Sequence, residues 1–311
     1  PEYRAVRGPG SILDAIADPE LSAEITMQPV RRYGVDAAIL YSDIVVPAHA
    51  VGFGVDVKPG LGPVVDQPFE RAADLQRLRP LEPEIDTPYV LETVRRVVAE
   101  ADVPLIGFAG APFTVASYLI EGAPSRTYGK TKALMLGDPG LWHDLMERLA
   151  DMAITSLRSQ IDAGVSAIQL FDSWAGSLQG EDFERYALAP TKAIITALKV
   201  RHPNIPIIAY PREAGDKYIG FAAATGADCV AVDNSVGPKW VAQHLQKDSC
   251  VQGNLKSSHM VTGGQALVDE ARQICTALSG GPHIFNLGHG ITPDADPGNV
   301  QLMIDTVRSA W

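Results

Sequence analysis

The stretch VPLIGFAGAPFTVASYLI, residues 103–120, carries no charged side chain over its whole length. Such a length could cross a bilayer, but Pro104, Gly107, Gly110 and Pro112 interrupt it and would weaken a spanning helix. An apolar run that ends at glycine and is followed by proline and a second apolar segment predicts a strand, a loop and the start of a helix. We therefore expect no membrane-spanning segment here, and we interpret the stretch as one β–α unit.

The same unit recurs along the rest of the chain. Runs of β-forming residues that end at a polar residue or a glycine occupy Ala37–Val46, Pro104–Gly110, Ala167–Trp174, Ile205–Pro211, Cys229–Asp233, Cys250–Leu255 and His283–Gly290. Segments with helical patterning lie between them, at Tyr89–Ala101, Gly140–Ala163, Asp182–Arg201, Ala214–Thr225, Pro238–Leu245 and Gln265–Leu278. This alternation predicts a parallel sheet with helical crossovers. A short hairpin is expected at Gly52–Pro63.

Seven strands would suit an open doubly wound sheet, whereas a closed (β/α)8 barrel needs one more. The polar residues and the glycine at the strand ends favour the barrel, because they are spread over every strand instead of gathering at one switch point. These groups are Asp43, Gly110, Asp172, Ser173, Tyr210, Asp233, Asn254 and His289. We therefore expect a single-domain α/β protein, a (β/α)8 TIM barrel over residues 1–311, with its first strand before Pro1.

Composition excludes several classes of protein. The 311 residues include 26 Lys and Arg against 37 Asp and Glu, a net charge of −11, which disfavours nucleic-acid binding and adhesion to anionic membranes. The histidines and the three cysteines form no metal-ligand spacing, so no metal is expected. Because the cysteines are odd in number and lie in apolar surroundings, we expect buried reduced thiols, as in a cytosolic protein.

Three strand-end segments carry most of the reactive groups. Asp43 lies in an otherwise apolar run, Tyr118 follows the glycine-rich loop after Gly110, and His289 stands between two glycines. Each residue also has a purely structural explanation. Asp43 could cap the next turn, Tyr118 could be a core aromatic residue, and His289 could make a structural hydrogen bond.

Five motifs, taken in order along the chain, are similar to those of the uroporphyrinogen decarboxylase family. They are YSDIVVP (41–47), GFAGAPFTVASYLIEG (107–122), QLFDSWAG (169–176), VQGNL (251–255) and NLGHGITP (286–293). The resemblance extends from the opening PEYR to the last helix, and it implies a closed eight-stranded barrel. It also implies a cytoplasmic, usually homodimeric enzyme of haem biosynthesis, a carboxy-lyase without metal or organic cofactor. Its reaction would convert the four acetate side chains of uroporphyrinogen III to methyl groups, giving coproporphyrinogen III and CO₂.

The resemblance also implies roles for individual residues. Asp43 matches the aspartate that faces the pyrrole N–H groups and supports catalysis. The remaining positions match substrate-binding residues of the family, with the two phenylalanines as walls of the pocket; they are Tyr118, Ser173, His289, Phe108 and Phe171.

The sequence departs from the family pattern in two places. The family's arginine-containing segment, similar to FMRQAGR, would directly precede the PEYR that begins at Pro1, so we expect these arginines and the eighth strand to lie before it. The segment Gly253–Ser258 reads GNLKSS where the family usually has GNLDP, and we place no site residue between Lys256 and Met260.

Two alternatives remain. One is a zinc- or corrinoid-dependent methyltransferase on the same barrel, which bound zinc would support. The other is a non-catalytic porphyrinogen-binding protein, which binding without turnover would support.

Overall fold

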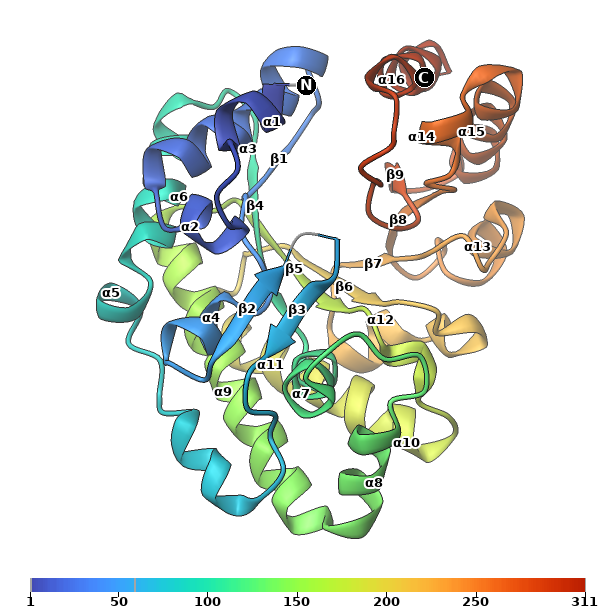
Figure 1. The fold of residues 1–311 in the computed structure, drawn as a ribbon. Coiled ribbons are helices and arrows are strands. Elements are labelled where there is room, and N and C mark those ends of the chain that lie inside the picture. The colour runs from blue at the N-terminus through green and yellow to red at the C-terminus, as the bar shows by residue number, and fades with distance from the viewer. Residues whose placement is uncertain (1, 59, 311) are drawn as a thin grey trace.

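Seven parallel strands form one curled sheet in the computed structural model, which describes residues 2–58 and 60–310 (Figure 1). In sheet order, which is also sequence order, they are β1 (Ala38–Ile39), β4 (Leu105–Gly110), β5 (Ala167–Asp172), β6 (Ile207–Pro211), β7 (Cys229–Ala231), β8 (Cys250–Leu255) and β9 (His283–Leu287). The sequential order is that of a TIM barrel and not of a doubly wound sheet, whose strand order reverses. The barrel prediction is thus confirmed as a TIM-barrel-like half-barrel of the seven predicted strands.

Helices cover the outside of this sheet (Figure 1). Their bounds are α1 (Glu2–Arg7), α2 (Ile12–Ile16), α3 (Pro19–Tyr33), α4 (Val46–Ala50), α5 (Pro83–Asp86), α6 (Pro88–Glu100), α7 (Pro112–Glu121), α8 (Gly129–Gly137), α9 (Pro139–Ala163), α10 (Glu181–Phe183), α11 (Ala189–Arg201), α12 (Phe221–Thr225), α13 (Pro238–His244), α14 (His259–Thr262), α15 (Gly264–Leu278) and α16 (Pro297–Ser309). The expected hairpin is present as antiparallel β2 (Val55–Lys58) and β3 (Gly62–Val65). No helix among the described residues is long and apolar enough to cross a bilayer.

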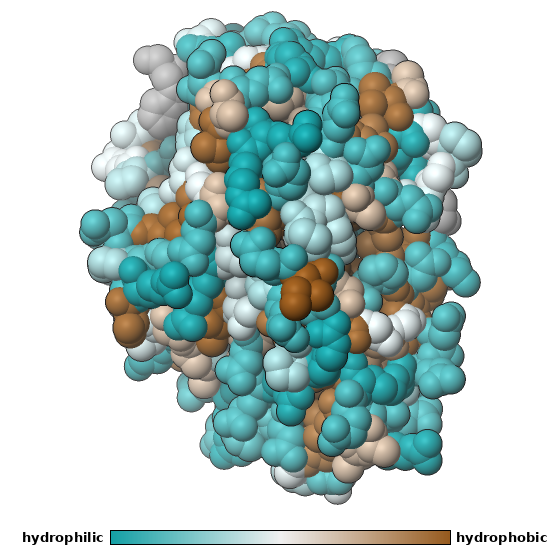
Figure 2. All heavy atoms as spheres, turned by 90° about the vertical axis from the view of Figure 1, so that its left-hand side faces the viewer, coloured by the Kyte–Doolittle hydropathy of each residue, from teal (hydrophilic) through white to brown (hydrophobic). Residues whose placement is uncertain are grey.

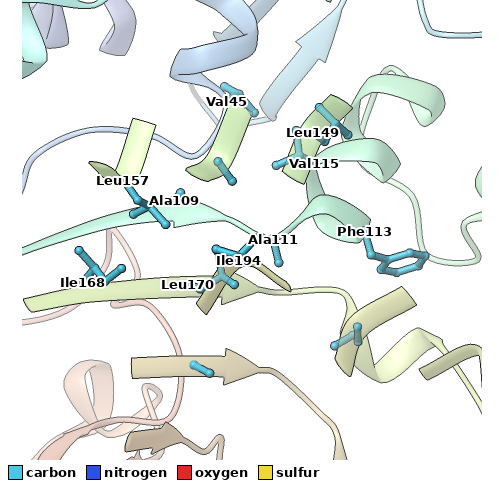
Figure 3. Close-up of a cluster of buried hydrophobic side chains, with 14 of the residues drawn as sticks. Val45, Ala109, Ala111, Phe113, Val115, Leu149, Leu157, Ile168, Leu170 and Ile194 are labelled. Atoms are coloured by element: carbon cyan, nitrogen blue, oxygen red, sulfur yellow. The ribbon is translucent and has the colours of Figure 1, made fainter. Parts of the chain in front are cut away.

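The main core lies between the outer face of the sheet and the helices (Figure 3). Ala109 of β4 and Leu170 of β5 point outward there and meet Leu157 of α9 and Ile194 of α11. Each fully buried aliphatic side chain of this kind contributes about 1.5–3 kcal/mol. The uncharged stretch 103–120 is therefore core and not membrane, since β4 and α7 account for most of it.

A smaller apolar cluster fills the inner face of the sheet. It contains Ile106, Phe171, Ile208, Tyr210, Cys229, Ala231 and Cys250. Because β4, β6 and β7 are buried on both faces, their sequences are continuous apolar runs and do not alternate. The cysteines are free thiols, as expected: Cys229 and Cys275 are buried and Cys250 is half-buried.

Contacts near the N-terminus connect the two edge strands, β1 and β9, which do not pair with each other in the described residues. The hydroxyl groups of Tyr3 and Tyr41 are 3.1 Å apart, and Arg4 donates to the carbonyl oxygen of Pro293 at 2.8 Å. Helix α1 therefore links the loop after β1 to the loop after β9.

One predicted strand is much shorter than expected. The run Ala37–Val46 contributes only Ala38–Ile39 to the sheet, and α4 begins at Val46. The β-branched residues Ile44, Val45 and Val46 suggested a continuing strand, but Pro47 takes the first turn of α4, where its missing N–H is not needed. Asp43 therefore lies in a loop.

Apolar side chains are scattered among hydrophilic ones on the face that carries α5 and α6 (Figure 2). Ile85 of α5 is one exposed apolar residue, at 72%. Scattered apolar residues of this kind are normal on a protein surface and mark no binding site by themselves.

Candidate active site

Asp43 lies in the loop between β1 and α4, at the carboxyl end of the sheet. Its Oδ1 accepts the backbone N–H of Val45 at 3.0 Å, so it does make a local turn contact, as the structural explanation suggested. Burial raises the pKa of the Asp43 carboxyl, while the N–H groups of Val45 and Ile44 oppose the rise. Two backbone N–H groups do not fully replace water around this carboxylate, so a ligand with further N–H donors would stabilise its ionised form.

Tyr118 lies near the end of α7, the helix that follows β4. Proline at the start of α7 and Gly122 at its end, with a positive φ of 74°, define the helix. The Tyr118 ring lies against Trp174, 5.7 Å between centroids. Burial, and then the charge of Asp43, raise the pKa of Tyr118 to about 12, so the hydroxyl is a hydrogen-bond donor at neutral pH and lies within the field of Asp43.

Phe108 and Phe171 form an aromatic wall on the inner face of the sheet. Their centroids are 5.5 Å apart in an edge-to-face arrangement, and Phe171 packs in the same way on Tyr210 at 6.1 Å. Phe108 and Asp43 also line a narrow pocket between β4 and the helices α6 and α9, together with Gln160 of α9. Gln160 binds both the N–H and the carbonyl group of Phe108, each at 2.9 Å, which fixes the backbone of the wall from the helix side of the strand.

Ser173 is half-buried in the turn after β5. Its neighbour Asp172 is fully buried and accepts the Thr114 hydroxyl at 2.6 Å; Thr114 in turn accepts the backbone N–H of Trp174 at 3.1 Å. Burial raises the pKa of Asp172 to about 7, with Thr114 opposing the rise. Asp172 therefore connects the turn that carries Ser173 to the start of α7, a role that the sequence did not suggest.

His289 is exposed in the loop after β9, where several contacts hold its backbone. A Cβ atom on Gly288 would lie 2.7 Å from the backbone nitrogen of Asn234, so only glycine allows this approach. The Tyr210 hydroxyl donates to the Gly288 carbonyl at 2.6 Å. Partial burial of the ring, and then the charge of Arg212, lower the pKa of His289, which is neutral at pH 7.

Ser257 also supports the histidine loop, because its hydroxyl donates to the carbonyl oxygen of His289 at 2.9 Å. Ser257 belongs to the segment Lys256–Met260, where the sequence predicts no site residue. This contact makes it a positioning residue for the loop. The departure from the family pattern was visible in the sequence, but its partner, 32 residues further along, was not.

The site residues fall into two groups that share an electrostatic environment. Asp43, Phe108 and Phe171 lie on the side of β4 and β5, whereas His289 lies above β9. Between them stands Arg212, directly after β6, whose charge affects the pKa values of both Tyr118 and His289. Arg212 was missed because an arginine after a strand is common on protein surfaces. No group of three or more His, Cys, Asp or Glu residues that could hold a metal occurs within residues 2–58 and 60–310.

Comparison with known proteins agrees with the motifs. A family model described as uroporphyrinogen decarboxylase (URO-D) matches residues 1–310. Curated relatives named uroporphyrinogen decarboxylase include those of Ruegeria pomeroyi, 56% identical over 99% of this chain and 90% of the relative, and Roseobacter denitrificans, 54% identical over the same shares.

Solved structures show the same architecture at low sequence identity. A methyltransferase from Methanosarcina mazei is 20% identical and superposes with a TM-score of 0.77, covering 99% of this chain and 90% of that one. A B12-independent methionine synthase from a Shewanella species is 10% identical with a TM-score of 0.59, over 94% and 86% of the two chains. These likenesses concern the fold alone. The match over nearly the whole chain, at more than half identical residues, shows that the chain belongs to the uroporphyrinogen decarboxylase family.

Proposed function

We propose that this protein is a carboxy-lyase of porphyrin and haem biosynthesis that converts uroporphyrinogen III to coproporphyrinogen III. The observation that carries the proposal is the family membership together with Asp43, which occupies the matching motif position at the carboxyl end of the sheet. Each of the four acetate side chains would lose CO₂ and take up one proton, leaving a methyl group.

The chemistry needs a place for the electron pair that the departing CO₂ leaves behind. Protonation of a pyrrole carbon turns the ring into a cation, and the C–C bond to the carboxylate then breaks toward that ring. A proton added to the resulting methylene carbon and the loss of the ring proton restore the pyrrole. The substrate itself accepts the electrons, so the proposal needs no metal or organic cofactor.

Asp43 would act at the centre of this reaction. Its ionised carboxylate would accept the pyrrole N–H groups and stabilise the cation that forms before CO₂ leaves. One preorganised group of this kind contributes about 3 kcal/mol to transition-state stabilisation. The substrate's N–H donors would counter the burial that raises the pKa of Asp43, which favours the ionised form in the complex.

The other site residues would orient the macrocycle. Tyr118, whose hydroxyl keeps its proton at neutral pH, would donate to a substrate carboxylate or to Asp43. Ser173 and the neutral His289 would bind further polar groups of the substrate. Phe108 and Phe171 would pack against the pyrrole rings, since their edge-to-face pair forms a fixed apolar wall.

Anaerobic incubation with uroporphyrinogen III tests the proposal directly. Coproporphyrinogen III and four equivalents of CO₂ are expected, with intermediates of seven, six and five carboxylates. Binding of the porphyrinogen without CO₂ release would favour the non-catalytic alternative. Stoichiometric zinc in the purified protein, together with methyl transfer, would favour the methyltransferase.

We also propose a cytoplasmic homodimer, as the family resemblance implies. Sedimentation equilibrium of the purified protein should give twice the 33.2 kDa chain mass, and cell fractionation should recover the protein with cytoplasmic markers. A monomer at micromolar concentration, or recovery in another fraction, would contradict the respective expectation.

A further inference from the structure

The proposed substrate has eight carboxylates, but the binding residues assigned within residues 2–58 and 60–310 provide no positive charge. Asp43 is an acid, Tyr118 and Ser173 are neutral, and the pKa of His289 is lowered. The chain as a whole carries a net charge of −11. A polyanion therefore needs a cation at the carboxyl end of the sheet, where the site residues lie. Arg212 stands there, between the two groups of site residues.

We propose that Arg212 is a substrate-binding residue, whose guanidinium group pairs with a carboxylate of the porphyrinogen. This inference rests on the proposed function and adds a residue that the family motifs did not supply. Arginine suits the role because its planar group binds a carboxylate through two N–H groups at once.

The backbone of Arg212 is fixed on the β5 side. Its N–H donates to the carbonyl oxygen of Asp172 at 3.1 Å, and its own carbonyl accepts the N–H of Gly176 at 2.9 Å. Gly176 has no room for a side chain, because a Cβ atom there would lie 2.5 Å from the Cβ of Glu213. Arg212 is thus locked beside the turn that carries Ser173.

The other side of the same corner is anchored to the loop after β7. Glu213 has a positive φ of 60°, which is unusual for a residue with a side chain, and its N–H donates to Asp233 at 2.5 Å. The Tyr218 hydroxyl donates to the same carboxylate oxygen at 2.7 Å. The sharp turn is therefore held by a buried acceptor, as expected for a position whose geometry serves a function.

The Arg212 side chain, directly after β6, is partly buried. It is 19% exposed, and its buried Nε has no hydrogen-bond partner among the described residues. Its charge opposes the rise in the pKa of Tyr118 and adds to the fall in the pKa of His289, so the guanidinium group lies within electrostatic reach of both residues. A carboxylate beside Arg212 would therefore also be within reach of the proposed binding residues.

Glu213 forms an ion pair with Arg212 and is itself 53% exposed. This glutamate orients the guanidinium group in the free protein. It also competes with an incoming carboxylate and repels it, so it should weaken substrate binding. The two neighbours are therefore expected to act in opposite directions, which a purely structural role of Arg212 would not produce.

The test compares four variants by their KM and kcat for uroporphyrinogen III under anaerobic conditions. Arg212→Gln should raise KM about tenfold or more, since a hydrogen bond to a charged group is lost. Arg212→Lys should recover part of this loss, and Glu213→Gln should lower KM. Arg158→Gln is the matched control, because Arg158 also has a buried Nε without a partner but lies on α9 away from the mouth.

A KM within twofold of the wild type for Arg212→Gln would overturn the proposal. So would an equal rise in Arg158→Gln, or a rise in KM for Glu213→Gln. Equilibrium binding of uroporphyrin, the oxidised octacarboxylate, separates this outcome from failure of the proposed function. If the wild type releases no CO₂, weaker uroporphyrin binding by Arg212→Gln would still support the residue's role, and unchanged binding would refute it.

Discussion

Asp172 is a carboxyl group enclosed at the end of β5, and its ionisation should make folding stability depend on pH. Burial raises its pKa from 3.8 to about 7. Between these two values the unfolded chain has released the proton that the folded protein still binds. Stability therefore falls as pH rises through this window, by about 1.4 kcal/mol for each unit. Over roughly three units the loss is on the order of 4 kcal/mol.

The substitution Asp172→Asn removes this ionisation while keeping an oxygen that can accept the Thr114 hydroxyl. Urea unfolding at pH 4 and pH 8 measures the effect. The variant should be much more stable than the wild type at pH 8 and similar to it at pH 4, where the window begins. Thr114→Val, which removes the hydrogen bond that lowers the pKa of Asp172, should extend the decline to higher pH. Parallel pH profiles for wild type and Asp172→Asn would refute the reasoning.

Three further substitutions test the rest of the site. Tyr118→Phe should lower kcat/KM for uroporphyrinogen III about tenfold, because one hydrogen bond to a charged group is lost. An unchanged kcat/KM would show that Tyr118 makes no such hydrogen bond to the substrate or to Asp43. His289→Ala should raise KM and change the distribution of partly decarboxylated intermediates in a chromatographic assay, whereas an unaltered distribution would count against its binding role. Gly288→Ala should lower both thermal stability and kcat/KM because its Cβ would collide with Asn234, while Gly290→Ala, with no atom within 4 Å, should behave as wild type.

The strands were predictable because burial on both faces leaves a signal that does not depend on partners. The run at β4 is continuous and uncharged and ends at a glycine, and β8 and β9 each end at a leucine followed by a change of pattern. Ala37–Val46 was too long because β-branched residues favour a strand, while Pro47 also favours the first turn of a helix. Only the surroundings decide between two such local preferences.

The site residues that lie in distinctive sequence motifs were predictable. Those whose roles depend on contacts with residues far away in the sequence were not. Asp43, Tyr118 and His289 stand in distinctive segments. Ser257 and Arg212 do not, because their roles depend on residues that the fold brings close, namely the carbonyl of His289 and the carboxylate of Asp233 beside Glu213. The pKa of Asp172 likewise depends on enclosure by α7, which no local pattern reveals.

The measurement that bears most directly on the proposed chemistry is anaerobic turnover of uroporphyrinogen III by the wild type and by Asp43→Asn, with thermal unfolding as the control for folding. The wild type should release four CO₂ per macrocycle. Asp43→Asn should keep its fold and lose at least a hundredfold in rate, as expected for about 3 kcal/mol of lost transition-state stabilisation. A folded Asp43→Asn variant with wild-type turnover, or a wild type that releases no CO₂, would contradict the proposed chemistry.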